Sequence, residues 1–325
     1  MNAKDQFLFV VSQVVGAVTL KHAADLLTDY SSPPDTLSEQ LAFLRALKKR
    51  TPHFKKEVSA ELWDEALLKT DKVLNAAAKH NITTLSIQDS RYPTLLRRLP
   101  DAPYFLDVKG DVNCLTNRCV AVVGTREITE HGRLSGKRLT EVFIDHKLTI
   151  VSGLAVGCDT VAHQAAVDAG SPTIAAMAGG LDNIYPKENR KLAEQIEARG
   201  CLISEYRCGV RPMAQMFVQR DRLQSGLSLG VVVIETGVTG GTMHTVGFAR
   251  KQQRRLGCLY THAQPKYAAQ WANAEKFQGN ASLVSEGKAE PLYDLPSITT
   301  FIDSLASVEA AIPGSNQSRG QLNLL

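Results

Sequence analysis

The chain has 325 residues, 44% of them apolar, which is enough to bury a full core and makes two domains the expectation from length. The net charge of +4 is compatible with a polyanionic partner but does not by itself indicate one. No signal peptide and no apolar run of about 18 residues is present, and the six cysteines form no C-x-x-C pair or His/Cys ligand cluster. These features argue against a secreted, membrane-bound or metal-binding protein and predict a cytoplasmic one without cofactors.

The first 80 residues have the pattern of helices. Apolar residues recur at helical spacing in Gln6–Leu27, Leu37–Lys49 and Leu62–Lys79, and Ser31-Ser32-Pro33-Pro34-Asp35 separates the first two segments. We therefore predict a small helical N-terminal domain over residues 1–80. Short strand-like pieces and turns follow up to about Asn117, and they could add an edge strand or an arm packed on a sheet.

Five short apolar runs come next, and helix-length segments alternate with them. The runs are Cys119–Val123, Leu148–Val151, Thr173–Ala178, Cys201–Ile203 and Leu229–Ile234. Strands that alternate with helices form a parallel sheet with right-handed crossovers. The predicted fold class is therefore α/β, an extended Rossmann-like parallel sheet with helices on both faces, over residues 81–311. An amphipathic helix is expected after Glu290, and residues 312–325 are expected to form a disordered tail.

Small or polar residues follow each predicted strand, and in a parallel sheet these positions share one edge. Open sheets of this kind bind ligands at that edge, where glycines allow close approach and amides and hydroxyls can hold phosphate. The candidate phosphate-contacting residues are Gly124, Thr125, Ser152, Gly153, Gly179, Gly180, Asn189, Gly240, Gly241 and Thr242. The alternative is that the glycines merely fit tight turns. Neither the dinucleotide fingerprint nor a P-loop is present, so hydrolysis of nucleoside triphosphates is not expected.

Four cations and one aromatic residue are the candidate nucleic-acid contacts. They are Arg126, Lys187, Phe217, Arg220 and Arg222. Guanidinium groups can take phosphates while a phenyl ring offers a face on which a base stacks. We expect the five side chains to converge on one rim. The alternative places Phe217 in the core and pairs the arginines with acids such as Asp221. No residue is predicted to be catalytic.

Several short motifs follow one another along the chain in a fixed order. They are Asp89-Ser90-Arg91-Tyr92-Pro93, Gly124-Thr125-Arg126, Val151-Ser152-Gly153-Leu154-Ala155, Gly180-Leu181-Asp182, Tyr185-Pro186, Ser204-Glu205, Arg220-Asp221-Arg222 and Gly240-Gly241-Thr242. Together they resemble the DNA-processing protein A family (DprA, also called Smf). The resemblance implies a non-enzymatic, homodimeric protein that binds and protects single-stranded DNA. It further implies help in loading a RecA-type recombinase during natural transformation, and a SAM- or HhH-like N-terminal domain.

The resemblance also implies roles for individual residues. Arg126 matches the family's phosphate-gripping arginine, Phe217 its base-contacting aromatic and Lys187 a neighbouring pocket position. Arg220 and Arg222 occupy the two arginines of its R-N-R segment, in which Asp221 replaces the amide. Val218 replaces a proline, and Ala214 and Gln215 replace basic residues of some relatives. The winged-helix domain of some relatives has no counterpart before residue 325.

Two other functions remain open. The sheet edge is similar to that of nucleotide-processing phosphoribohydrolases of the lysine-decarboxylase-like (LOG) superfamily, with Glu205 and Glu235 as candidate acids. Those enzymes carry a carboxylate just after the glycine-rich loop, whereas here Thr242-Met243-His244 follows it. A nucleotide sensor, for instance in a defence setting, is the other alternative.

Overall fold

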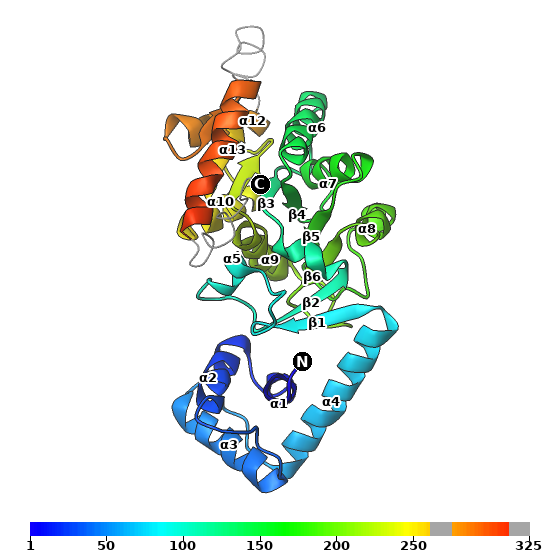
Figure 1. Cartoon of the computed structure of the whole chain (residues 1–325), viewed down its shortest axis with the longest axis vertical. Helices are drawn as coiled ribbons and strands as arrows, with labels where there is room; N and C mark the ends of the chain where they lie inside the picture. Colours follow the sequence, from blue (N-terminus) through cyan, green and yellow to red (C-terminus); the bar gives the residue numbers. More distant parts are fainter. Residues whose placement is uncertain (261–274, 312–325) are drawn as a thin grey trace, which may run out of the picture.

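The computed structural model describes residues 1–260 and 275–311. Its N-terminal part, residues 1–80, is helical as predicted. Its helices are α1 (Ala3–Ser12), α2 (Ala17–Leu27), α3 (Leu37–Arg50) and α4 (Ala60–Lys79). The stretch Gln6–Leu27 is two helices and not one, because the chain is extended at Gly16 and glycine is a poor helix former. The long helix α4 leads directly into the sheet (Figure 1).

The four N-terminal helices share a core of their own and are fixed to the sheet. The ring of Phe7 packs against Phe43 at 5.0 Å and against Trp63 at 5.6 Å between ring centroids. A buried carboxylate, Asp5, accepts a hydrogen bond from Ser86 Oγ of the first strand at 2.8 Å. Whether residues 1–80 form an independent domain stays a prediction.

A nine-stranded sheet forms the rest of the molecule, in the order β1-β2-β6-β5-β4-β3-β7-β8-β9. The strands are β1 (Ile82–Ser86), β2 (Phe105–Gly110), β3 (Cys119–Val123), β4 (Thr149–Ser152), β5 (Thr173–Ala176), β6 (Cys201–Ser204), β7 (Gly230–Val233), β8 (Arg255–Leu259) and β9 (Glu290–Leu292). From β6 across to β9 every pair is parallel, whereas β1 and β2 add an antiparallel edge. The five predicted strands and the extra edge strand are confirmed, and β8 and β9 were not predicted.

Helices cover both faces of the sheet, which confirms the predicted fold class. They are α5 (Thr94–Arg97), α6 (Glu130–Asp145), α7 (Cys158–Asp168), α8 (Arg190–Glu197), α9 (Ala214–Leu227), α10 (Gly241–Lys251), α12 (Glu275–Ser285) and α13 (Leu295–Ala310), with 3-10 turns at Val112–Thr116 and Lys187–Asn189. Alternate residues of β3 face opposite cores: Val120 packs with α6, α7 and α13, and Ala121 packs with α9 and α10. The strands are therefore apolar along their whole length, as sheets covered on both faces require.

The sheet changes direction between β3 and β7. From β3 the chain moves outward through β4, β5 and β6, then returns to place β7 on the other side of β3. The loops that follow β3 and β7 consequently leave the sheet in opposite directions and open a crevice between them. In open α/β sheets this is where ligands bind.

Some predictions fall outside this description or concern absences. Residues 312–325, expected to form a tail, lie outside the described residues. Within residues 1–260 and 275–311, no helix has the length and apolar character needed to cross a bilayer. Over the same ranges, no cluster of His, Cys, Asp and Glu side chains has the arrangement of a metal site.

Candidate nucleic-acid interface

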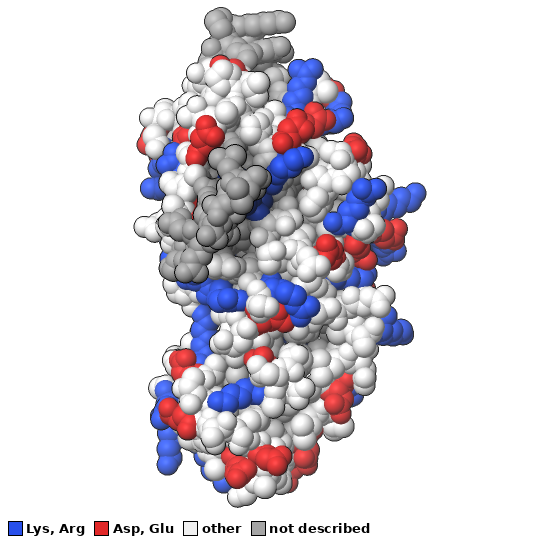
Figure 2. All heavy atoms as spheres, in the orientation of Figure 1, with Lys and Arg blue, Asp and Glu red and all other residues white. Residues whose placement is uncertain are grey.

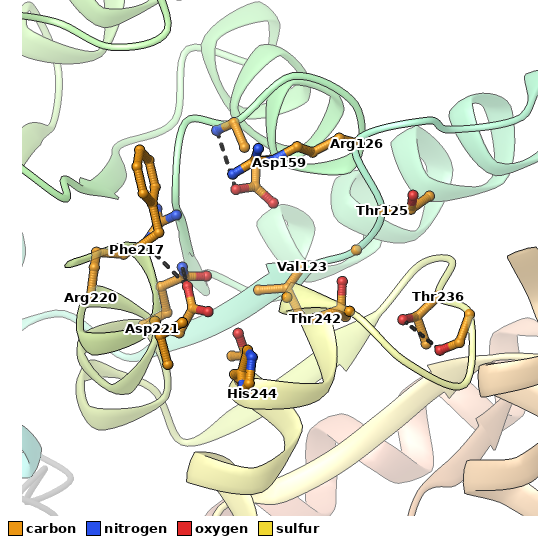
Figure 3. A pocket seen from close by; sticks show the side chains of 18 of the residues that line it. Val123, Thr125, Arg126, Asp159, Phe217, Arg220, Asp221, Thr236, Thr242 and His244 are labelled. Carbon is orange, nitrogen blue, oxygen red and sulfur yellow. Dashed lines mark hydrogen bonds and ion pairs between the residues drawn. The ribbon is translucent and has the colours of Figure 1, made fainter. Parts of the chain in front are cut away.

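A hollow of about 710 Å³ lies at the crevice between β3 and β7. We call it the switch-point hollow. Its walls come from the loops after β3 and β7, from α9 and from the start of α10, with Ala155, Asp159 and Tyr185 completing the lining. The lining residues that matter most are Gly124, Thr125, Arg126, Phe217, Asp221, Gly240, Gly241 and Thr242. Figure 3 shows side chains from these separate segments pointing into the same space. Five of the predicted site residues, Arg220 among them, thus line the same hollow as three of the predicted glycines, Gly124, Gly240 and Gly241.

The loop after β3 presents Arg126 to solvent. Thr125 N–H donates to Glu235 O at 2.8 Å, and Cys158 N–H donates to Thr125 O at 3.1 Å, so the backbone before Arg126 is held from both sides. A side chain at Gly124 would overlap Cys158, which explains the glycine by close packing. Arg126 itself is exposed, and no ion pair among the described residues uses its guanidinium. The arginine is therefore free to take an anion.

Phe217 lies beside Arg126 and is only partly buried, so its ring lies at the rim of the hollow and not in the core. The Arg126 guanidinium carbon is 5.6 Å from the centroid of the Phe217 ring, within cation–π range. Tyr185, 48% exposed, packs edge-on against the other part of Phe217 at 5.6 Å. A cation and two aromatic rings thus form one continuous surface, which suits a phosphate next to an unstacked base.

The start of α10 closes the opposite wall. Gly240 has a φ of 121° and caps the helix, a left-handed conformation that favours glycine. A Cβ at Gly240 or Gly241 would meet nothing within 4 Å, so the backbone at the start of α10 borders open space. Helix amino termini carry a partial positive charge and unpaired N–H groups, which attract phosphate.

The structure corrects the prediction that Arg220 lies on an open rim. Arg220 lines the hollow but is only 4% exposed, and its Nη1 donates to Gly153 O at 2.6 Å and to Ala176 O at 2.8 Å. Its Nε lies 3.2 Å from Asp221 Oδ1. The guanidinium therefore ties α9 to the ends of β4 and β5, and it contributes charge to the hollow without being free to swing out.

Arg222 is not part of the hollow, which is a second correction. The side chain is 6% exposed and lies between Glu205, at 2.7 Å, and Asp101, at 3.1 Å. Residues two apart on a helix do not share a face, so α9 directs Arg222 away from Arg220 and from the switch-point hollow. It lines a different hollow of about 550 Å³, between α2 and the sheet.

Four other predicted phosphate contacts, Asn189, Gly179, Gly180 and Ser152, are packed within the protein instead. Asn189 is buried and donates to Leu154 O and Thr160 Oγ1, both at 2.8 Å. Gly179 and Gly180 are buried against the backbone of residues 207–212 and leave no room for a side chain. Ser152 Oγ donates to Val122 O at 2.6 Å inside the sheet. The structure therefore places none of the four on the switch-point hollow, and the exposed Lys187 does not line it either.

Comparison with known proteins bears directly on this arrangement. The family model for DNA recombination-mediator protein A matches residues 83–303, which include the whole sheet from β2 to β9. This chain belongs to that family.

Relatives in the DNA recombination-mediator protein A family support the assignment. The chain is 36% identical over 189 residues to DNA processing protein DprA of Bacillus subtilis, and 39% identical over 171 residues to that of Streptococcus pneumoniae. These matches cover 58% and 53% of this chain, and 64% and 60% of the two relatives. The matched part is thus less than two thirds of either relative's own length.

Two solved structures of family members share the fold. The X-ray structure of DprA from Streptococcus pneumoniae superposes with a TM-score of 0.73 at 25% identity, covering 92% of this chain and 98% of that one. DNA processing protein A from Helicobacter pylori, solved for its single-stranded DNA binding mode, gives a TM-score of 0.58 at 27% identity. That match covers 70% of this chain and 96% of the Helicobacter chain.

Two acidic residues, Asp159 and Asp221, line the hollow and were not predicted as site residues. Asp221 Oδ1 accepts from Gln224 at 3.1 Å, and the carboxylate of Asp159 lines the same wall. Burial raises the pKa of Asp221 to about 7, against the opposing charge of Arg220 and with help from Asp159. Burial likewise raises the pKa of Asp159. The signal available in the sequence was the carboxylate between two arginines, noted only as a departure from the family pattern.

Proposed function

We propose that this protein binds single-stranded DNA in the switch-point hollow and acts as a recombination mediator. One observation carries the proposal: an exposed arginine without an ion-pair partner in the described residues stacks on an accessible phenylalanine, at the sheet edge where ligands bind. Phosphate would be held by Arg126 and the α10 amides, and a base would stack on Phe217. Family membership and the relative solved for its single-stranded DNA binding mode support the same role.

We also propose the partners that this role implies. They are a second copy of the chain and a RecA-type recombinase, met in the cytoplasm while single strands are being processed. Protection of incoming strands in natural transformation would follow from the same binding site. Gel filtration with light scattering tests the dimer, and pull-down with a purified RecA-type protein tests the second partner.

Fluorescence anisotropy tests the binding function itself. Labelled oligo-dT, duplex of the same length and a mononucleotide are titrated at two salt concentrations. We expect oligo-dT to bind tightly at low salt and to lose affinity by orders of magnitude at moderate salt, because each phosphate contact releases counterions. Equal affinity for the mononucleotide would contradict the proposal, because it would leave no role for the strand.

Phe217→Ala should raise the dissociation rate of oligo-dT while leaving the salt dependence nearly unchanged. Stacking of a base on an aromatic ring contributes roughly 1–3 kcal/mol and involves no counterion. Stopped-flow dissociation at two salt concentrations measures both quantities. Leu134→Ala, at an exposed apolar residue of α6, is the control. A lower salt slope in Phe217→Ala would show that the ring acts by positioning a cation and not by stacking.

Release of a base from a nucleoside monophosphate is the second candidate function. It is favoured by Asp159 and Asp221, two buried carboxylates on the hollow, since a carboxyl group with a pKa near 7 can act as a general acid. The acids expected from the sequence are less suited, because Glu235 accepts from Thr129 N–H at 2.9 Å and from its hydroxyl at 2.5 Å, and Glu205 pairs with Arg222. Chromatography of incubated nucleoside monophosphates tests this function, and activity that Asp221→Asn abolishes would favour it.

A further inference from the structure

A third hollow, of about 460 Å³, lies at the opposite edge of the sheet. It is bounded by the end of α5, the turn between α10 and β8, and the end of α13. Four cations line it, Arg98, Lys251, Arg254 and Arg255, and its described lining includes no carboxylate and no aromatic side chain. We call it the basic hollow. Figure 2 shows Lys and Arg side chains in several groups on one face of the molecule, one of them at mid-height.

Arg254 is fixed in the wall of the basic hollow by backbone carbonyls. Its Nε donates to Ser225 O at 3.2 Å, and its Nη2 is 3.4 Å from both Leu95 O and Gly226 O. No hydrogen bond within the described ranges uses its Nη1. A guanidinium held in this way loses little further freedom when it takes an anion, which is the general advantage of a preorganised site.

The positive charge of the basic hollow is mostly uncompensated. Arg255 pairs with Glu290, but Arg98, Lys251 and Arg254 have no ion pair in the part of the chain that the structure describes. Arg98 donates from Nη1 to Ala311 O at 2.7 Å, which places a second guanidinium near Arg254. Burial, and to a lesser extent the charge of Arg98, together lower the pKa of Arg254 to about 10. An anion bound between them would remove this repulsion.

A single helix connects the basic hollow with the switch-point hollow. Gly241 at the start of α10 lines the switch-point hollow, and Lys251 at its end lines the basic hollow. Eleven helical residues rise about 16 Å, a distance that an extended strand of a few nucleotides covers. The basic hollow is also far larger than the ~30 Å³ share of one water molecule, so a phosphate with its sugar can enter.

We propose that the basic hollow binds backbone phosphates of the same single strand whose base occupies the switch-point hollow. The inference rests on the proposed function and extends it to a second contact region. Cations without an aromatic surface take phosphate and ribose but do not stack bases, so this contact is independent of sequence. It lengthens the bound strand and steepens its salt dependence.

Oligonucleotide length tests the proposal. We compare oligo-dT of about 6 and about 16 nucleotides, which span the site sizes typical of single-strand-binding folds. In Arg98→Glu/Lys251→Glu we expect the long oligomer to bind roughly tenfold or more weakly, with its salt slope reduced by about 1.4 for two lost phosphates. The short oligomer should bind as it does to the wild type. Both residues are exposed, and Lys251→Glu alone provides a milder variant if the melting temperature falls.

A matched control separates this site from general electrostatics. Lys69→Glu/Lys72→Glu changes the net charge equally at exposed positions of α4 and should leave both oligomers unaffected. Equal weakening in the control, or equal weakening of both lengths, would overturn the inference. A third outcome would also overturn it. If Arg98→Glu/Lys251→Glu binds both oligomers as the wild type does, while inorganic phosphate raises the melting temperature of the wild type but not of the variant, the basic hollow holds free phosphate and not the strand. Wild-type protein that binds neither oligomer would instead refute the proposed function on which the inference rests.

Discussion

Arg126→Ala should weaken the binding of oligo-dT by roughly tenfold or more and lower the salt slope by about 0.7, the value for one phosphate contact on a single strand. The side chain is exposed, its guanidinium lies over Phe217, and it has no ion pair within the described residues that would compete for a phosphate. A phosphate contact that is both charged and bidentate is among the stronger polar contacts a protein makes.

The stability of the variant gives the prediction its sharpest control. Arg126 makes no buried hydrogen bond among the described residues, so its removal should leave the melting temperature unchanged. Arg138 is a second exposed arginine and lies on α6, away from the hollow. Arg138→Ala removes the same charge as Arg126→Ala and should bind oligo-dT with wild-type affinity. Arg126→Lys should fall between wild type and alanine, because it keeps the charge but loses the planar fork. Wild-type affinity in Arg126→Ala would place the strand elsewhere.

Asp221→Asn should strengthen single-strand binding above neutral pH and flatten its dependence on pH. With a pKa of about 7, the wild-type carboxyl group is largely protonated near pH 6 and largely ionised near pH 8. The ionised form repels a phosphate held by Arg126, so wild-type affinity should fall as the pH rises through this range. The fall can approach tenfold per pH unit if binding requires one proton.

The same substitution has a defined effect on stability. The folded pKa of Asp221 is raised above the ordinary value, so the folded state binds the proton more tightly than the unfolded state does. Its contribution therefore favours folding at low pH and is lost as the pH rises through about 7. Asp221→Asn should consequently raise the melting temperature above neutral pH, and this gain should shrink as the pH falls from about 7 toward the ordinary carboxyl value of 3.8.

Two measurements decide this prediction. Anisotropy titrations between about pH 6 and pH 8 follow the affinity, and thermal melts over the same range follow stability. His244 also lines the hollow, so His244→Gln serves as the control. The charges facing Asp221 are those of Arg220, Asp159 and Arg126. A pH dependence that persists in Asp221→Asn and disappears in His244→Gln would assign it to the imidazole.

Much of the sheet could be predicted from the sequence because its central strands are continuous apolar runs. Continuous runs of β-branched or small apolar residues are typical of strands that are covered on both faces. Two such runs are Val120–Val123 and Val231–Ile234. In contrast, β8 contains Gly257 and begins with an arginine, and β9 has three residues with a central proline. Such segments carry no periodicity, and their pairing with β7 and with each other defines them as strands.

The candidate site could be predicted only in part, for a geometrical reason. Arg220 and Arg222 were expected to act together on an open rim, because they are two cations close in sequence beside the aromatic Phe217. They lie on a helix, where residues two apart point in different directions, and both are buried. The basic hollow could not be predicted because Arg98 and Lys251 are distant in sequence and resemble ordinary surface residues.

The contact between Gly153 and Arg220 has a consequence for the kinetics of recognition. Any side chain at position 153 would overlap the guanidinium, so the ends of β4 and β5 and helix α9 are locked at a fixed spacing. Phe217 is one turn before Arg220 on that helix, so the ring is already held where a base would meet it. The entropy lost on association then comes mainly from the nucleic acid, whose flexibility, more than any rearrangement of the protein, would limit the rate at which the two meet productively.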